Sequence, residues 1–171
     1  MKRLLYVILL FTFINMDAQT SVTVDNVNLE KYSGLWYEIA RYPQWFEREM
    51  TNVTAEYIPQ DGFIKVINKG LKKGCKRESE GKAFVVKDSG NSKLKVQFFW
   101  PFKGDYWIIG LDKAYNWAVI SNQKKSSLWI LSRSPEMDKL TLDSILNVLA
   151  KRGFDLKRIE FTKQDKCMQP Q

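Results

Sequence analysis

Between residues 34 and 133 the chain alternates short runs of β-forming residues with clusters of turn residues, and this pattern constrains the fold most. Val53, Ala55 and Tyr57 alternate with polar neighbours, and the same period of two recurs over residues 93–100. Side chains spaced in this way occupy one face of a half-buried strand. Further strands are expected at residues 34–41, 63–69, 80–87, 106–112, 117–121, 128–133 and 158–162.

The breaks between these runs have the composition of tight connections. Residues 60–62, 88–91, 103–105 and 122–124 are rich in Gly, Asp, Asn, Ser and Lys. Eight successive strands joined by short turns predict an all-β fold, an antiparallel up-and-down meander that closes into an eight-stranded barrel without exposed edges. A short final strand at residues 158–162 would follow.

One convincing helix follows the eighth strand. Its apolar residues recur at i, i+3, i+4 and i+7, namely Leu142, Ile145, Leu146 and Leu149. Asp138 is a suitable N-terminal cap and Gly153 a suitable left-handed stop. We expect this α-helix to pack outside the barrel. Since the chain shows no linker, low-complexity tract or repeat, residues 19–171 are predicted to form a single domain.

Composition excludes several kinds of site. The 171 residues include no histidine and only two cysteines. Ser-His-Asp and Cys-His catalysis, His-ligated zinc and His-ligated haem therefore cannot operate, and two cysteines cannot supply a zinc ribbon or an iron–sulfur cluster. No metal or cofactor is expected.

Three short regions carry a resemblance to a known family. They are the Gly-x-Trp strand that begins at Gly34 and Trp36, the turn that contains Asp112, and Arg133 at the end of the eighth strand. These regions resemble the three signature regions of the lipocalin family, and further matches across residues 29–167 are most similar to the bacterial lipocalin and apolipoprotein D branch. The resemblance implies that Trp36 closes the barrel floor with Arg133 across its indole, both in structural roles.

The same resemblance implies that function resides in the barrel interior, which in an eight-stranded barrel has room for one small ligand. Strand parity predicts that Val53, Ala55, Tyr57, Val96 and Phe98 point inward. The family register adds Ile64, Val66, Ala83, Leu94, Tyr106, Ile108, Trp129 and Leu131. Such a wall suits a small hydrophobic ligand of the fatty acid or lysophospholipid type. The alternative is a barrel filled by its own side chains.

The loop after the first strand corresponds to the lid that lipocalins place over the open mouth. It contributes an apolar set consisting of Tyr42, Trp45, Phe46 and Met50. An apolar lid with a polar rim would admit a lipid or touch a bilayer surface. The other interpretation is a loop packed down on its own barrel.

Residues 1–18 have the features of a secretory signal peptide. Lys2 and Arg3 precede an apolar run that is too short to span a bilayer, and Ala18 offers a cleavage position. We therefore expect export to the periplasm or the exterior. Association with the outer membrane remains open, but no cysteine lies near the cut to carry an N-terminal lipid anchor. In an oxidising compartment Cys75 and Cys167 are expected to form a disulfide; in a cytoplasmic protein they would be free thiols.

The charge balance admits rival functions. Lys and Arg exceed Asp and Glu by 27 to 19, with clusters at residues 72–77 and 124–125. Such clusters attract an anionic membrane surface, as an additional peripheral contact, or nucleic acid; the other interpretation is a solvated lysine-rich surface without a partner. Because the aromatic residues alternate into the interior and export is expected, no nucleic-acid partner is predicted. Monomer and dimer both remain open.

Catalysis by paired carboxylates is the last alternative. The acidic residues are scattered over strand exteriors and turns, whereas a glycoside hydrolase needs two close together in a cleft. Glu38 is the exception, since its parity with Trp36 directs it inward, where it would orient a ligand or pair with Arg41. We expect a binding protein and not an enzyme, with no catalytic residues.

Overall fold

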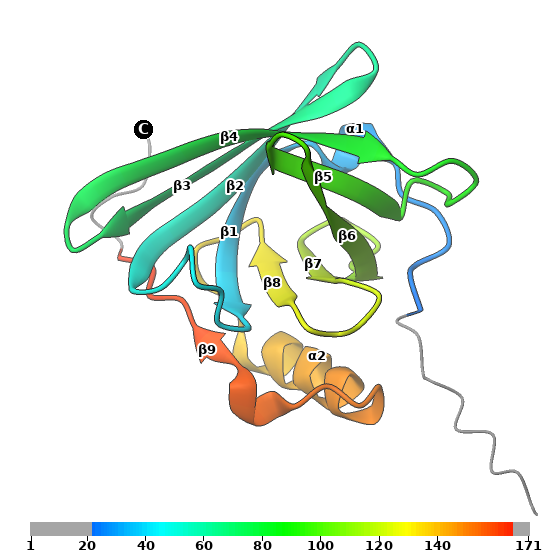
Figure 1. Ribbon diagram of the computed structural model, residues 1–171. Helices are drawn as coiled ribbons and strands as arrows, with labels where there is room; N and C mark the ends of the chain where they lie inside the picture. The colour runs from blue at the N-terminus through cyan, green and yellow to red at the C-terminus, as the bar shows by residue number, and fades with distance from the viewer. Residues whose placement is uncertain (1–21, 166–171) are drawn as a thin grey trace, which may run out of the picture.

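The strands of the protein wind around a central space, with a helix packed against their outer side (Figure 1). The computed structural model describes residues 22–165. Its helices are α1 (Leu29–Tyr32), α2 (Lys139–Lys151) and a 3-10 turn, η1 (Leu156–Arg158). Its strands are β1 (Gly34–Arg41), β2 (Met50–Gln60), β3 (Phe63–Lys72), β4 (Cys75–Val85), β5 (Lys93–Phe99), β6 (Phe102–Leu111), β7 (Trp117–Ser121), β8 (Leu128–Ser132) and β9 (Glu160–Phe161).

All strand pairings among the described residues are antiparallel and connect neighbours in sequence from β2 to β8. The first strand closes the barrel, because β1 pairs with β2 on one side and with β8 on the other. Register is set by pairs such as Trp36 with Ala55 and Glu38 with Leu131. The short β9 adds to the C-terminal end of β1, where Ala40 pairs with Phe161. The expected up-and-down barrel with a final short strand is confirmed.

The molecule has two cores, one on each side of the sheet. Inside the barrel, Trp36, Tyr32 and Leu94 belong to a cluster that fills the closed end. Outside, Ile109 and Ile130 pack with the apolar stripe of α2. Strands β7 and β8 are buried on both faces, which explains why they are continuous apolar runs and not alternating ones.

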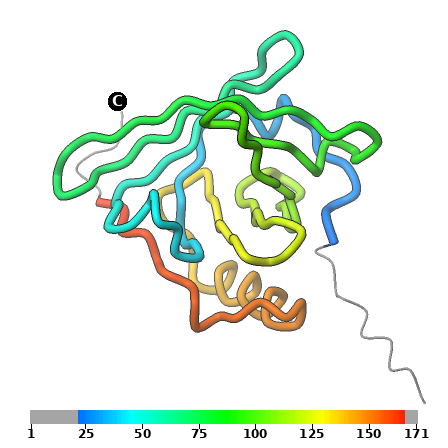
Figure 2. The backbone as a smooth tube through the Cα atoms, in the orientation of Figure 1, coloured from blue at the N-terminus to red at the C-terminus, as the bar shows by residue number. Residues whose placement is uncertain are grey.

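Helix α2 begins and ends at the residues that its sequence indicates. The Asp138 side chain accepts a hydrogen bond from the Thr141 backbone N–H at 2.9 Å, and Gly153 follows the helix with a φ of 77°. Ile145 and Leu149 are buried against the barrel. In the trace of Figure 2 the helix lies entirely outside the ring of strands, as expected.

Three local differences from the sequence-based expectation have physical causes. Strand β4 begins at Cys75 and not at residue 80, because residues 75–80 are exposed on both faces and hydrophobic alternation cannot reveal such a strand. Residues 103–105, expected as a break, lie within β6, and the turn falls at Trp100 and Pro101 instead. The single turn α1 was not expected, since four residues are too few for a helical period.

Some expectations fall outside the described residues. The predicted signal peptide, residues 1–18, and Cys167 both lie there. Cys75 is exposed at the start of β4. Because Cys167 lies outside the described residues, the Cys75–Cys167 disulfide stays a prediction. Within residues 22–165 no helix combines the length and apolar character needed to cross a bilayer.

Candidate ligand-binding cavity

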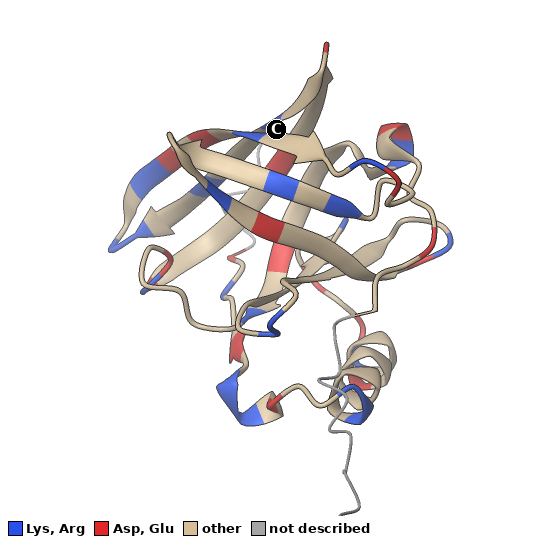
Figure 3. Cartoon of the chain, turned by 45° about the vertical axis from the view of Figure 1, so that its right-hand side comes forward, with Lys and Arg blue, Asp and Glu red and all other residues tan. Residues whose placement is uncertain are grey.

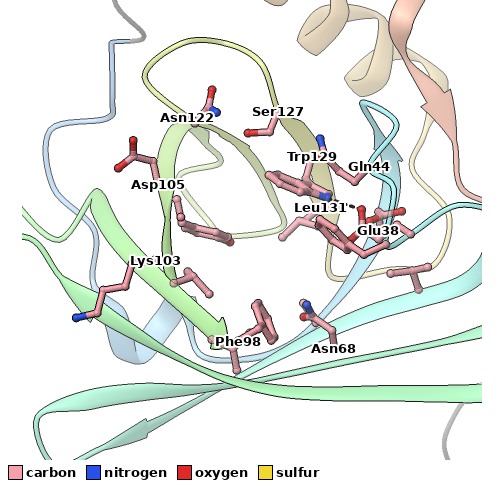
Figure 4. A pocket seen from close by; sticks show the side chains of 18 of the residues that line it. Glu38, Gln44, Asn68, Phe98, Lys103, Asp105, Asn122, Ser127, Trp129 and Leu131 are labelled. Atoms are coloured by element: carbon pink, nitrogen blue, oxygen red, sulfur yellow. Dashed lines mark hydrogen bonds between the residues drawn. The ribbon is translucent and has the colours of Figure 1, made fainter. Parts of the chain in front are cut away.

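A cavity of about 620 Å³ occupies the end of the barrel opposite Trp36, with apolar side chains over most of its wall (Figure 4). It opens between the β1–β2, β5–β6 and β7–β8 connections, each of which contributes lining residues. Of the residues expected to face inward, those that line it are Val53, Ala55, Tyr57, Val66, Val96, Phe98, Tyr106, Trp129 and Leu131.

Four residues expected in the wall occupy a different level of the barrel. Ile64, Ala83, Leu94 and Ile108 point inward but do not line the cavity; they are buried around Trp36 in the closed end. Strand parity gives the face of a residue and not its height along the barrel axis. Side chains thus fill the closed end of the barrel around Trp36, and the cavity occupies the other end.

The loop between β1 and β2 divides into two parts. Trp45 and Phe46 line the cavity entrance, with their rings 5.6 Å apart and nearly perpendicular, and both are exposed. Tyr42, expected in the lid, is instead fully buried against Phe154 in the outer core. Met50 is the first residue of β2, and its terminal methyl packs against Gly70 and not on the cavity.

The cavity floor rests on a tryptophan held by an arginine. The indole of Trp36 is fully buried, and the Arg133 guanidinium carbon lies 3.8 Å from the centre of its ring. Arg133 also donates to the backbone oxygens of Leu35 at 2.7 Å and Ser33 at 2.9 Å. The guanidinium therefore joins the indole to the chain segment that enters β1, where Gly34 has a φ of 89°.

Asp112 acts on this floor from the adjacent turn. Its carboxylate accepts the backbone N–H groups of Ala114 at 3.2 Å and Asn116 at 3.1 Å, which shapes the β6–β7 turn. The same turn bonds Arg133, whose backbone N–H donates to the Asn116 oxygen. The carboxylate supports the position of Arg133 without touching the cavity.

Three phenols supply a polar point just above the floor. The Tyr106 hydroxyl oxygen lies 2.6 Å from that of Tyr32 and 2.7 Å from that of Tyr57. Burial raises the pKa of all three phenols, so they stay neutral at physiological pH. Either oxygen can be the donor in each contact, because a hydroxyl group both donates and accepts.

A buried acid–base cluster interrupts the apolar wall. Glu38 points inward and pairs with Arg41, whose Nη1 lies 2.5 Å from its Oε1; Thr162 donates a second hydrogen bond to the same oxygen. Glu47, from the β1–β2 loop, accepts a hydrogen bond from Trp129 Nε1 at 3.1 Å. Both carboxylates line the cavity, yet each residue is less than 10% exposed, at 2% for Glu38 and 8% for Glu47.

This environment changes the acidity of Glu47. Burial, together with repulsion from Glu38, raises the pKa of Glu47 from 4.5 to about 7, and the hydrogen bond from Trp129 and the charge of Arg41 offset only part of the shift. Sequence reasoning could not find this site, because Glu47, Arg48 and Glu49 are three consecutive charged residues in a loop and only the first is buried.

A pH-dependent stability follows for Glu47. Because its pKa is higher in the folded state, the folded protein binds more protons between pH 4.5 and 7, and the free energy of unfolding falls as pH rises through this window. Glu47→Gln, which keeps an acceptor for Trp129, is expected to raise the free energy of unfolding at pH 8 by about 1–3 kcal/mol and to change it little at pH 5. Urea denaturation at both pH values measures this; equal effects at the two would contradict it.

The rim of the cavity carries exposed aromatic residues that the sequence pattern did not reveal. Phe99, Trp100 and Phe102, at the tip of the β5–β6 hairpin, are 72%, 87% and 76% exposed, and Trp45 is 83% exposed. The period of two over residues 93–100 would place Trp100 on the same face as Phe98, but the strand ends at Phe99 and Trp100 lies in the turn, exposed to solvent. A pattern of alternation does not show where a hairpin turns.

Basic residues lie in the connections between strands as well as on the strands (Figure 3). Lys73, at the β3–β4 turn, lies 3.7 Å from Glu49 of the β1–β2 loop, which places the basic end of this hairpin beside the cavity mouth. Lys76 and Arg77 follow it, and Lys124 lies in the β7–β8 connection. Lys125 instead donates to the Arg152 backbone oxygen at 2.7 Å and lies over the Phe154 ring in the outer core, so the second cluster is divided between the β7–β8 connection and the outer side of the barrel.

A closed antiparallel barrel with an apolar cavity at one end and a tryptophan–arginine floor at the other defines a class of small-molecule-binding proteins. The chain belongs to the lipocalin family: the family pattern described as "Lipocalin-like domain" matches residues 27–164.

Named relatives and solved structures agree with this assignment. The chain is 41% identical over 145 residues to "Outer membrane lipoprotein Blc" of Vibrio cholerae, covering 82% of this chain and 85% of the relative. It is 32% identical over 153 residues to apolipoprotein D of Macaca fascicularis, covering 84% and 80%. The structure of insecticyanin from the tobacco hornworm shares the fold, with a TM-score of 0.72 at 24% identity and 85% coverage of both chains.

Proposed function

We propose that this protein binds and carries a small hydrophobic ligand of the fatty acid or lysophospholipid type in the barrel cavity. The observation that carries the proposal is the cavity itself, about 620 Å³ and mainly apolar. Cavities of roughly 300–1,000 Å³ are the usual size for small-molecule sites. The alternative of a barrel filled by its own side chains is disfavoured, because Phe98, Tyr106 and Trp129 face open space.

Burial supplies the binding energy. Each methylene removed from water contributes roughly 0.8 kcal/mol, so a twelve-carbon chain offers about 10 kcal/mol before the cost of association. Binding of this kind needs no catalytic group, and we propose a carrier and not an enzyme. The close carboxylate pair, Glu38 and Glu47, is accounted for by its contacts with Arg41 and Trp129.

The proposed location is outside the cytoplasm, in the periplasm or beyond. The apolar run in residues 4–14 and the name of the Vibrio relative, an outer membrane lipoprotein, support export to the cell envelope. A part in envelope maintenance or stress response is proposed with it. Export also favours the Cys75–Cys167 disulfide.

The described end of the chain supports that pairing. The Asp165 backbone N–H donates to Asn52 Oδ1 at the start of β2. Only β3 lies between β2 and β4, the strand that begins with Cys75. Cys167 is two residues further along the chain.

Titration of intrinsic tryptophan fluorescence tests the carrier function, because Trp129 and Trp45 line the cavity. Lysophosphatidylcholine and dodecanoate, each kept below the concentration at which micelles form, are expected to change the emission saturably with one site per chain. A signal that rises without saturation, or none at all, would refute a lipid-carrying cavity.

We further propose that the mouth of the barrel makes a peripheral contact with an anionic membrane surface. Phe99, Trp100 and Phe102 are apolar and exposed at the rim, while Lys73 and Lys124 provide positive charge at the same end. Aromatic residues favour the headgroup region, and each Lys or Arg near an anionic surface adds about 1 kcal/mol. Such a contact would let a lipid pass between bilayer and cavity without crossing water.

Binding to vesicles of 30% phosphatidylglycerol in phosphatidylcholine measures this contact by co-sedimentation. The double variant Trp100→Ser/Phe102→Ser is expected to bind about tenfold more weakly than the unaltered protein, since two exposed aromatic side chains no longer enter the interface. Phe161→Ser, which removes a 61% exposed phenylalanine from β9 outside the barrel, serves as the control.

Equal binding of the double variant and the control would rule out docking through the mouth. Salt-dependent binding to oligonucleotides that exceeds binding to the vesicles would instead favour the nucleic-acid alternative.

A further inference from the structure

The two buried carboxylates present unused oxygens to the cavity. The hydrogen bonds from Arg41 and Thr162 both reach Oε1 of Glu38, and that from Trp129 reaches Oε2 of Glu47. Within residues 22–165 neither Glu38 Oε2 nor Glu47 Oε1 forms a side-chain hydrogen bond. Neither oxygen is a fully buried atom that lacks a partner, so each keeps some accessible surface. Both residues line the cavity, and Figure 4 shows the Glu38 side chain on its wall.

The positive partner of this pair does not reach the cavity. Arg41 is 5% exposed and is absent from the lining; its Nη2 donates to the Glu47 backbone oxygen at 3.0 Å and its Nε is buried without a partner. A molecule in the cavity therefore meets carboxylate oxygens and not the guanidinium.

The other titratable groups facing the cavity do not cancel this charge. Tyr57 and Tyr106 are neutral, and Lys103 and Asp105 are opposite charges on one strand at the mouth. With both carboxylates ionised, Glu38, Glu47 and Arg41 together carry a net charge of −1. A negative charge on the wall of an apolar cavity favours a ligand that carries a positive charge, because a buried charge without a partner is costly.

We propose that Glu38 and Glu47 form a subsite for a positively charged nitrogen, so that the preferred ligand is an amphiphile whose apolar chain carries an ammonium group and not a free fatty acid anion. This inference rests on the proposed carrier function and narrows its ligand class. The Trp129 indole, bonded to Glu47 through its Nε1, lines the same wall and offers an aromatic face to the cation. Figure 4 shows Glu38, Gln44 and Trp129 together on this side of the cavity.

The state of Glu47 couples this selectivity to pH. Because the pKa of Glu47 is about 7, its carboxyl group gains negative charge between pH 5.5 and pH 8.5. A cation that binds the ionised form lowers the pKa of Glu47, and a lowering of one unit corresponds to tenfold in affinity. The affinity for a carboxylate ligand is expected to fall as Glu47 ionises.

Three probes with the same twelve-carbon chain separate charge from burial. They are dodecyltrimethylammonium, dodecanoate and dodecanol, titrated by tryptophan fluorescence at pH 5.5 and 8.5; the ammonium head keeps its charge throughout, and the carboxyl head is mostly ionised at both values. The affinity for the ammonium probe is expected to rise about tenfold between these pH values, that for dodecanoate to fall, and that for dodecanol to stay constant.

Two variants distinguish the wall from the surface. Glu47→Gln keeps the acceptor for Trp129 but removes the charge, so its affinity for the ammonium probe is expected to be independent of pH and equal to the unaltered protein's value at pH 5.5. Glu49→Gln removes the same charge two residues further on, where the side chain is exposed and pairs with Lys73, and is expected to behave like the unaltered protein.

The outcomes separate this inference from the carrier function. Suppose that dodecanol binds at one site per chain. If the affinity for the ammonium probe then does not rise with pH, or rises equally in Glu47→Gln, the cationic subsite is refuted and the carrier function stands. If none of the three probes binds, the carrier function fails with it.

Discussion

Replacing Trp36 with alanine is expected to lower the free energy of unfolding by about 4 kcal/mol, within the range of roughly 3–5 kcal/mol found for tryptophan removed from a core. The indole is fully buried and donates through Nε1 to the Tyr32 backbone oxygen at 2.8 Å. Its loss also leaves the Arg133 guanidinium without the aromatic face on which it lies. Because no neighbouring element can collapse into the closed end of a barrel, little of the cavity will refill.

Urea denaturation of the purified protein measures this effect, with Trp100→Ala as the matched control. Trp100 is 87% exposed, so the same substitution there is expected to change the free energy of unfolding by less than about 0.5 kcal/mol. A loss below about 1 kcal/mol in Trp36→Ala would show that the floor does not hold the barrel together.

Phe98→Arg is expected to weaken the binding of any apolar ligand by at least about 100-fold, because a guanidinium in the cavity opposes burial of an alkyl chain. Phe98 lies on β5, lines the cavity and packs beside Gly81 of β4, where its ring fills space that an added Cβ would enter. The side chain is only half-buried, so an arginine at this position can extend its charged end toward the mouth. Stability should therefore fall much less than affinity.

The control for Phe98→Arg is the same substitution on the outside of the molecule. Phe161→Arg changes an exposed residue of β9, and its ligand affinity should match that of the unaltered protein in the fluorescence titration. Lysophospholipid affinity of Phe98→Arg within about threefold of the unaltered protein would place the ligand outside the barrel.

These two substitutions act at opposite ends of one barrel. The closed end contains the inner core and the Arg133 hydrogen bonds, while the open end contains the cavity, the Glu47 carboxylate and the exposed rim. Trp36 and Arg133 do not line the cavity, and the exposed rim residues Phe99 and Phe102 do not belong to the inner core, so variants at the rim are expected to leave the barrel intact.

Sequence periodicity predicted the inward face of β2 and β5, and the resemblance to the family register extended this to other strands. The bounds of β1 and β7 agree with the sequence, and Val53 and Tyr57 point inward as their alternation indicates. Periodicity could not give the height of a residue in the barrel, which is why Ile64 and Leu94 fill the closed end and do not line the cavity. It also could not reveal the exposed start of β4, where no face is buried.

The chemistry of the wall was less accessible. Parity identified Glu38 as inward and its pairing with Arg41 as one outcome, because both residues lie on β1. The participation of Glu47 depends on how the β1–β2 loop folds back to Trp129, a contact between residues 82 positions apart. Local sequence carries no record of such a contact, and the raised pKa of Glu47 follows from it.

Native mass spectrometry of the protein purified from its own host tests the central claim most directly. The account predicts a population that carries one extra mass of a few hundred daltons, consistent with a single amphiphile, which is lost on denaturation and absent in Phe98→Arg. Protein that emerges bare, and that remains bare after incubation with excess lysophospholipid, dodecanol and dodecyltrimethylammonium, would contradict the claim that this barrel carries an apolar ligand.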